Sequence, residues 1–171
     1  MKNIVLIGMP GAGKSTIGVV LAKILGYQFV DSDLLIQQQE GKVLHQIIAE
    51  RGIDGFLAIE NQVNRDMDVS HSVISTGGSA VYGGEAMAAM KKNGVIVYIQ
   101  LSYENLTSRL GDLNQRGVVL REGYSLKELY AERRPLYEKY ADITVNVDGL
   151  TIEGAIEKMR DAVEKVMEGA L

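Results

Sequence analysis

A glycine-rich segment near the N-terminus has the residue types and spacing of a phosphate-binding loop. It fits the pattern G-x-x-x-x-G-K-[ST] over residues 8–15 and is followed by Thr16. Glycines let backbone N–H groups turn inward on phosphate oxygens, because no Cβ blocks the approach. Lys14 adds a full positive charge, and the Ser15 hydroxyl can ligate Mg²⁺. We expect this phosphate loop to bind a nucleotide through Gly11, Ala12, Gly13, Lys14, Ser15 and Thr16.

Two acids follow the second apolar run of the chain. Asp31 and Asp33 come directly after residues 27–30, which read as a strand. Strand alternation places both carboxylates on one side, at the sheet edge where doubly wound folds bind ligands. Asp33 could instead cap the next helix. The phosphate loop on a neighbouring strand end favours a role in the site.

The elements that must position these residues alternate along the chain. We expect strands at 4–7, 27–30, 73–75, 95–99 and 143–147, and helices at 14–25, 85–92, 103–110, 125–139 and 151–167. Several helical stretches lie between 34 and 66, and the polar, aperiodic stretch 111–124 is expected to be a mobile loop. The pattern predicts one α/β domain over residues 1–171, with a central parallel five-stranded sheet flanked by helices.

Composition and charge limit the partners of the chain. The 171 residues carry a net charge of −4, which gives no general attraction to nucleic acid or anionic membranes. Cys is absent and His occurs twice, which excludes disulfides and disfavours a metal site built from these residues. The apolar run before Gly8 is too short for a signal peptide or a membrane span. We expect a cytoplasmic monomer that acts on a small molecule, without nucleic acid or membrane.

Other classes of phosphate-loop protein fit the sequence less well. A guanine-reading N-K-x-D segment is absent, and the nearest stretch, residues 91–94, has neither its order nor its Asp. Large ATPases carry an apolar strand that ends in Asp, whereas the strand at 95–99 runs into Gln100. These absences favour a small kinase.

Several motifs together resemble the shikimate kinase family over essentially the whole chain. After the phosphate loop and the two acids come Gly55-Phe56 with Glu60, then Thr76-Gly77-Gly78, Arg109 and Arg116, and finally Arg133 before Pro135-Leu136-Tyr137. The resemblance implies an ATP-dependent kinase that phosphorylates a hydroxyl of a small metabolite, with ATP and Mg²⁺ required. It also implies substrate-binding helices at about 34–66 and a lid at about 111–124.

The resemblance also implies a role for each residue of the site. Asp33 would accept the proton of the attacking hydroxyl, and Asp31 would hold Mg²⁺ through water beside Ser15. Lys14 and Arg116 would act on the transferring phosphoryl group, Arg116 being carried by the lid. Gly77, Gly78 and Arg133 would bind the substrate, and Arg109 would stack on adenine. Taken singly, each arginine could equally be a solvated surface charge.

The acceptor half of the pattern departs from the family at two positions. Leu57 stands where the family has an arginine that shares the shikimate carboxylate with the counterpart of Arg133, and Ser79 alters the glycine triplet. Losing such an arginine would cost about 3 to 6 kcal/mol unless another cation, such as Arg65 or Arg134, replaces it. A kinase of a different hydroxylated or amino acceptor is therefore an alternative. A non-catalytic nucleotide-binding module and a nucleoside or nucleotide kinase also stay open.

Overall fold

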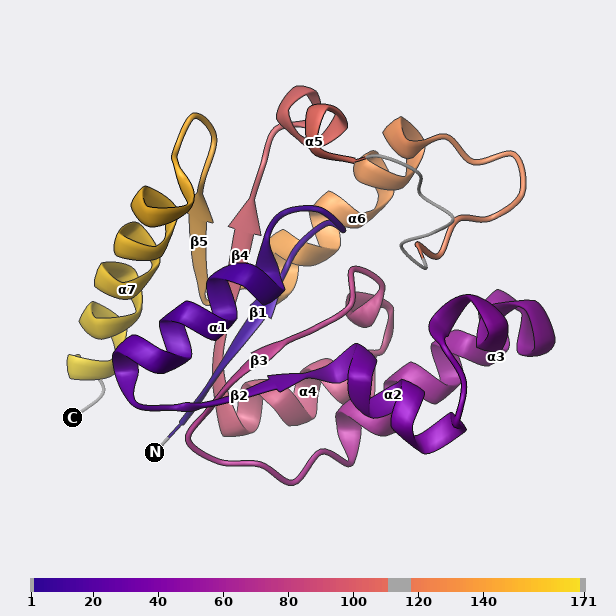
Figure 1. The fold of residues 1–171 in the computed structure, drawn as a ribbon, viewed down its shortest axis with the longest axis horizontal. Helices are drawn as coiled ribbons and strands as arrows, with labels where there is room; N and C mark the ends of the chain where they lie inside the picture. The colour runs from indigo at the N-terminus through magenta and orange to yellow at the C-terminus, as the bar shows by residue number, and fades with distance from the viewer. Residues whose placement is uncertain (1, 111–117, 170–171) are drawn as a thin grey trace.

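The computed structural model describes residues 2–110 and 118–169, and a five-stranded parallel sheet lies at its centre. The strands lie in the order β2-β3-β1-β4-β5 (Figure 1). This sheet confirms the expected fold class. In chain order the elements are β1 (Asn3–Ile7), α1 (Lys14–Leu25), β2 (Gln28–Asp31), α2 (Ser32–Glu40), α3 (Leu44–Arg65), β3 (Ser72–Ser75), the 3₁₀ turn η1 (Ala80–Tyr82), α4 (Gly84–Asn93), β4 (Gly94–Gln100), α5 (Tyr103–Arg109), α6 (Leu126–Tyr140), β5 (Ile143–Asn146) and α7 (Ile152–Glu168).

The central strands are buried on both faces because helices cover the sheet from two sides. Every residue of β1 is buried, and β4 is buried up to its last residue, Gln100. Helices α1 and α7 pack together on one face, whereas α4 and α6 contact β4 on the other (Figure 1). Near-continuous Val and Ile runs are typical of such strands, since neither face meets water. No helix within the described ranges is both long and apolar enough to cross a membrane.

A second, smaller core lies beneath helices α2 and α3. Its buried residues come from α2, from α3 and from the segment that follows residue 117, and they are Ile36, Ile47, Phe56, Val63 and Val119. The two helices project from the sheet beside its β2 edge (Figure 1). They form one wall of the region next to the strand ends.

The expected elements match the observed ones except where the backbone changes direction locally. The helical region 34–66 divides after Glu40, because Gly41 adopts a left-handed conformation with φ 66° and ends α2. Helix α3 is itself interrupted at Gly52, with φ 70° and ψ 175°. The short turn η1 was not expected, since three residues are too few to show a period.

Candidate active site

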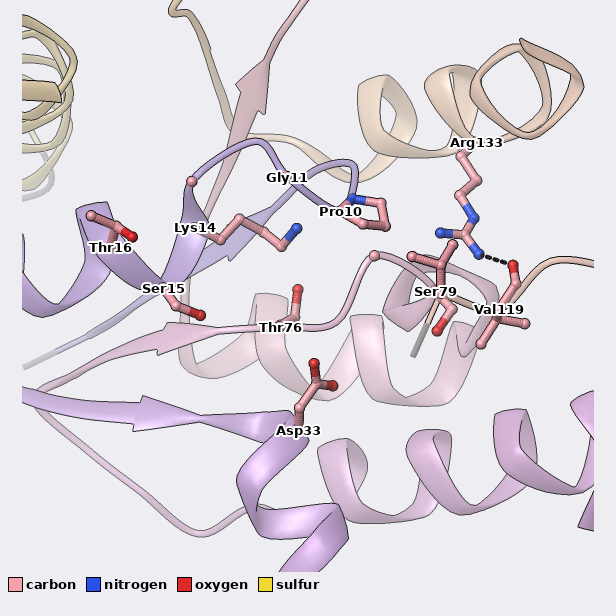
Figure 2. Close-up of a pocket in the computed structure, with 13 residues that line it drawn as sticks. Pro10, Gly11, Lys14, Ser15, Thr16, Asp33, Thr76, Ser79, Val119 and Arg133 are labelled. Atoms are coloured by element: carbon pink, nitrogen blue, oxygen red, sulfur yellow. Dashed lines mark hydrogen bonds between the residues drawn. The ribbon is translucent and has the colours of Figure 1, made fainter. Parts of the chain in front are cut away.

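The carboxyl ends of β1, β2 and β3 surround a cavity of about 320 Å³. It is lined by the phosphate loop, by Asp33 and by the turn after β3, with Arg133 reaching in from α6 (Figure 2). Because the strands are parallel, their carboxyl ends meet at one edge of the sheet, and the loops that follow them converge there. The cavity therefore brings together most of the site residues that the sequence indicated.

The phosphate loop wraps around the side chain of Lys14. Its ammonium nitrogen donates to the carbonyl oxygens of Gly8 and Met9, at 2.7 and 2.8 Å, and only 8% of the residue is exposed. Burial, with a smaller contribution from the positive charge of Arg133, lowers the pKa of Lys14 to about 8, although the carboxylate of Asp33 opposes the shift. The ammonium group points into the cavity (Figure 2), so anionic phosphates there would restore its preference for the charged form.

Three oxygens meet at the start of α1. The Ser15 hydroxyl donates to Asp31 Oδ2 at 3.1 Å and lies 3.1 Å from Ser75 Oγ. Oxygen donors of this kind suit Mg²⁺, so the residues present fit that ion. Asp31 also caps α2, because its Oδ1 accepts from the backbone N–H groups of Asp33 and Leu34. The sequence left open whether Asp33 caps the helix that follows it. In the structure the capping residue of α2 is Asp31.

Asp33 is left with its carboxylate facing the cavity (Figure 2). Burial, together with the neighbouring charge of Asp31, raises the pKa of this carboxyl to about 6 against the opposing effect of Lys14. A carboxylate with a raised pKa is a better proton acceptor than an exposed one, since proton transfer is most efficient when its pKa lies near the working pH. The position therefore suits a general base.

The turn after β3 brings the backbone close to several side chains. A Cβ at Gly77 would lie 2.7 Å from Asp33 Oδ1, and one at Gly78 would lie 2.7 Å from Pro10 Cδ and 2.9 Å from Arg133 Nη1. At such distances a Cβ at either position would force its neighbours to move, so glycine is favoured at both. Tyr137 fixes the turn, because its hydroxyl donates to the Gly78 carbonyl oxygen at 2.6 Å.

Arg133 is buried to 1% exposure beside this turn. Its Nη2 donates to the Val119 carbonyl oxygen at 2.9 Å (Figure 2), and its guanidinium carbon lies 5.4 Å from the centre of the Tyr82 ring. Within residues 2–110 and 118–169, no carboxylate forms an ion pair with it. A buried cation without an anionic partner is costly, so this position suits an anionic ligand group.

Glu60 and Ser79 meet behind the glycine turn. The Ser79 hydroxyl donates to Glu60 Oε1 at 2.7 Å, and both residues are buried. The pKa of Glu60 is raised to about 7, chiefly by burial and also by the charge of Asp33, while the Ser79 hydrogen bond, Arg133 and Lys14 oppose the shift. The sequence marked both positions but gave no sign of this contact, which joins residues on two different elements.

Leu57 packs against the second core and lines a small cavity of about 20 Å³ together with Arg121, Glu132 and Arg133. Neither of the two candidate replacement cations reaches the larger cavity. Arg65 pairs with Asp66 and Glu85, and Arg134 pairs with Glu138, in both cases at the surface. In the described part of the chain, Lys14 and Arg133 are the cations that line the larger cavity.

Arg109 and Arg116 are the remaining arginines that the sequence indicated. Arg109 lines a smaller cavity of about 90 Å³ with Thr16 and Val147, on the far side of the phosphate loop. This position is compatible with a base-binding role. Arg116 and the first part of the expected lid, residues 111–117, lie outside the described residues.

Comparison with known proteins identifies the family. A model described as shikimate kinase matches residues 10–164 of this chain. The chain belongs to the shikimate kinase family. It is 37% identical over 172 residues to the shikimate kinase of Thermodesulfovibrio yellowstonii, with 99% of each chain covered.

Solved structures of shikimate kinases share the whole fold. The enzyme of Aquifex aeolicus is 33% identical and superposes with a TM-score of 0.84, covering 98% of this chain and 99% of the other. A shikimate kinase from Acinetobacter baumannii, in complex with shikimate, is 30% identical with a TM-score of 0.77, covering 98% and 92%.

Membership of the shikimate kinase family establishes the class of reaction. The chain is an ATP-dependent small-molecule kinase, similar to shikimate kinases over almost its full length. The comparisons do not favour a different acceptor or a module without catalysis. The departures at Leu57 and Ser79 therefore need an explanation within the family.

Proposed function

We propose that this kinase transfers the γ-phosphoryl group of ATP to a hydroxyl of shikimate. The observation that carries the proposal is the single cavity in which Lys14, Asp33 and Arg133 converge. Lys14 and the backbone N–H groups of residues 11–16 would hold the phosphates, with Arg109 at the base. Residues 1–171 would act as one kinase unit, and helices 34–66 would enclose the acceptor.

Asp33 would orient the acceptor hydroxyl and take its proton as the oxygen attacks the γ-phosphorus. Its raised pKa matches this task, because the carboxyl can both lose and regain a proton near neutral pH. Arg116, carried by the lid at 111–124, would stabilise negative charge on the transferred group. Mg²⁺, contacted by the Ser15 hydroxyl and by Asp31 through water, would neutralise charge on the phosphate oxygens when bound.

Arg133 would bind the shikimate carboxylate. The guanidinium is buried, reaches Gly78 with Nη1 and has no ion-pair partner in the described ranges, so an incoming carboxylate would supply its counter-charge. Gly77 and Gly78 would let the ring lie against the backbone, where a Cβ would intrude. Because Arg133 is buried, its interaction with a carboxylate would be stronger than that of an exposed arginine.

A coupled assay of ADP release with ATP, Mg²⁺ and shikimate tests the proposal. We expect saturable turnover, and phosphorylated shikimate as the product by mass spectrometry. The comparison acceptors are quinate, which has a carboxylate, and cyclohexane polyols, which lack one. Faster turnover of a polyol than of shikimate would refute the acceptor assignment.

A further inference from the structure

Neutral oxygen atoms hold the buried guanidinium group of Arg133 in one orientation. Its Nη2 donates to the Val119 carbonyl oxygen at 2.9 Å, and its Nε donates to the Tyr82 hydroxyl oxygen at 3.4 Å. The guanidinium carbon also lies 5.4 Å from the centre of the Tyr82 ring, which is within the range of a cation–π contact. These contacts leave Nη1 beside the glycine turn, where a Cβ at Gly78 would lie 2.9 Å from it.

The hydroxyl of Tyr82 is itself oriented by Glu132, the neighbour of Arg133 on α6. The hydroxyl donates to Glu132 Oε1 at 2.7 Å, and this hydrogen bond is the main cause that lowers the pKa of Glu132 below its ordinary value. An ionised carboxylate can only accept, so the one proton of the hydroxyl is committed to Glu132. The lone pairs of the tyrosine oxygen are therefore directed to other donors, and Arg133 Nε is the donor that meets them.

The contact between Tyr82 and Arg133 combines two weak interactions. A separation of 3.4 Å is long for a hydrogen bond from nitrogen to oxygen. The bond to Glu132 polarises the tyrosine oxygen and makes it a better acceptor, since linked hydrogen bonds strengthen one another. The ring adds an electrostatic attraction of its own.

A hydroxyl between the acid and the cation keeps the charge of Arg133 available to a ligand. Within residues 2–110 and 118–169, Glu132 and Arg133 form no ion pair. A direct ion pair would occupy the guanidinium nitrogens and compete with an incoming carboxylate. Acting through Tyr82, the acid can orient the guanidinium without taking the place of the ligand.

The other side chains around Tyr82 do not provide this orientation. Tyr82, Glu132 and Arg133 line the small cavity that Leu57 and Arg121 also border. Leu57 brings no charge, and the side chain of Arg121 is 53% exposed and pairs with Asp54 at 3.0 Å. A single cation binds a carboxylate more tightly when its orientation is fixed beforehand, because less side-chain freedom is lost on binding.

We propose that Tyr82, held by Glu132, is a positioning residue that orients Arg133 toward the carboxylate of the acceptor. The inference rests on the proposed function and deepens it, since it identifies the contacts that fix the cation assigned to that carboxylate. The preference of this kinase for an acidic acceptor then depends on Tyr82 and Glu132 as well as on Arg133.

The test measures KM for shikimate, KM for ATP and kcat in the wild type, Tyr82→Phe and Glu132→Gln. Tyr82→Phe keeps the ring beside the guanidinium and removes only the hydroxyl. We expect it to raise KM for shikimate about 3- to 10-fold, as for one lost hydrogen bond, and to leave KM for ATP and kcat within about twofold. Glu132→Gln should raise KM for shikimate about 2- to 5-fold, because an amide is a weaker acceptor than a carboxylate.

Two matched controls lie on α6. Tyr130→Phe also removes a tyrosine hydroxyl, one that donates to the Leu101 carbonyl oxygen at 2.8 Å, and Glu138→Gln neutralises an acid that pairs with Arg134. Neither should change KM for shikimate by more than about twofold. In an Arg133→Met background Tyr82→Phe should also have less than a twofold effect on kcat/KM for shikimate, because the hydroxyl acts through the guanidinium.

The Nε–H signal of Arg133 in the ¹⁵N-labelled protein gives a readout that does not depend on turnover. Its loss in Arg133→Met assigns the signal, and we expect Tyr82→Phe to shift it and to speed its exchange with water, whereas Tyr130→Phe leaves it in place. A signal unchanged in Tyr82→Phe, or already lost to rapid exchange in the wild type, overturns the role of Tyr82. So do equal rises in KM for ATP and shikimate.

The same measurements separate this inference from the proposed function. A wild type that does not phosphorylate shikimate overturns the assigned acceptor and, with it, the positioning of Arg133 for that acceptor. The Nε–H signal would then show only whether Tyr82 holds the guanidinium. Turnover of shikimate with no effect of Tyr82→Phe on its KM overturns the role of Tyr82 alone.

Discussion

Replacing Asp33 by Asn is predicted to stabilise the fold while it abolishes catalysis. The protein raises the pKa of this carboxyl from 3.8 to about 6, chiefly by burial. A shift of this size corresponds to about 3 kcal/mol by which the folded state disfavours the ionised form. Asn is neutral at every pH and avoids this cost.

The sign of the effect depends on pH. Below about pH 4 the carboxyl is protonated in both the folded and unfolded chains, and the wild type carries no penalty. As pH rises from 4 to 6 the unfolded chain ionises first, so the wild type loses stability, and the full loss is present above pH 6. Asp33→Asn should therefore exceed the wild type by up to about 3 kcal/mol at pH 8, or about 6 to 12 °C in Tm.

Denaturant unfolding at pH 4, 6 and 8, together with the ADP-release assay, measures both effects. We expect kcat to fall about 100- to 10,000-fold, since a general base is lost. Asp54→Asn is the matched control, because Asp54 is exposed and, among the residues described, its ion pair is with Arg121; the stability of this variant should stay within about 0.5 kcal/mol of the wild type. An Asp33→Asn variant that is less stable than the wild type at pH 8 would refute the reasoning.

Three further substitutions examine other parts of the cavity. Lys14→Met should lower kcat at least about 100-fold, measured at saturating ATP; a loss confined to KM for ATP would contradict a role in the chemical step. Arg133→Lys should raise KM for shikimate about 10- to 100-fold in steady-state assays and leave KM for ATP nearly unchanged. Gly78→Ala should lower the free energy of unfolding by about 1 to 3 kcal/mol, measured by thermal unfolding. Its Cβ would lie less than 3 Å from the Pro10 ring and from the Arg133 guanidinium. Gly84→Ala is its control: its Cβ would make only an ordinary van der Waals contact, 3.9 Å from the Tyr140 hydroxyl oxygen, so no loss is expected there.

The sheet and the phosphate loop could be predicted because they depend on local patterns. Buried parallel strands read as apolar runs, and Lys14–Leu25 was predicted to the residue, since Gly26 in a left-handed conformation ends the helix. The region 34–66 could not be divided correctly. Its break at Gly41 and the interruption at Gly52 depend on backbone angles that the packing of α2 on α3 selects.

The acceptor side could be predicted only in part, because its contacts join distant segments. The sequence indicated Arg133, but its burial depends on α6 packing against η1. Arg65 and Arg134 were candidate replacements for the missing arginine because of their positions in the sequence. In the structure both lie at the surface, where they form ion pairs with acidic residues. The contact between Glu60 and Ser79 spans 19 positions and exists only because α3 lies beside the glycine turn.

Helix α6 carries both Arg133, the buried cation beside the cavity, and Tyr137, whose hydroxyl is hydrogen-bonded to the glycine turn. Arg133 and Tyr137 are four positions apart, and the second also stacks on Tyr98 in β4, with ring centres 5.1 Å apart. Both the guanidinium at the cavity and the position of the Gly78 turn therefore depend on where α6 lies. A substitution that displaced α6 would therefore disturb the anion-binding guanidinium and the glycine turn at the same time.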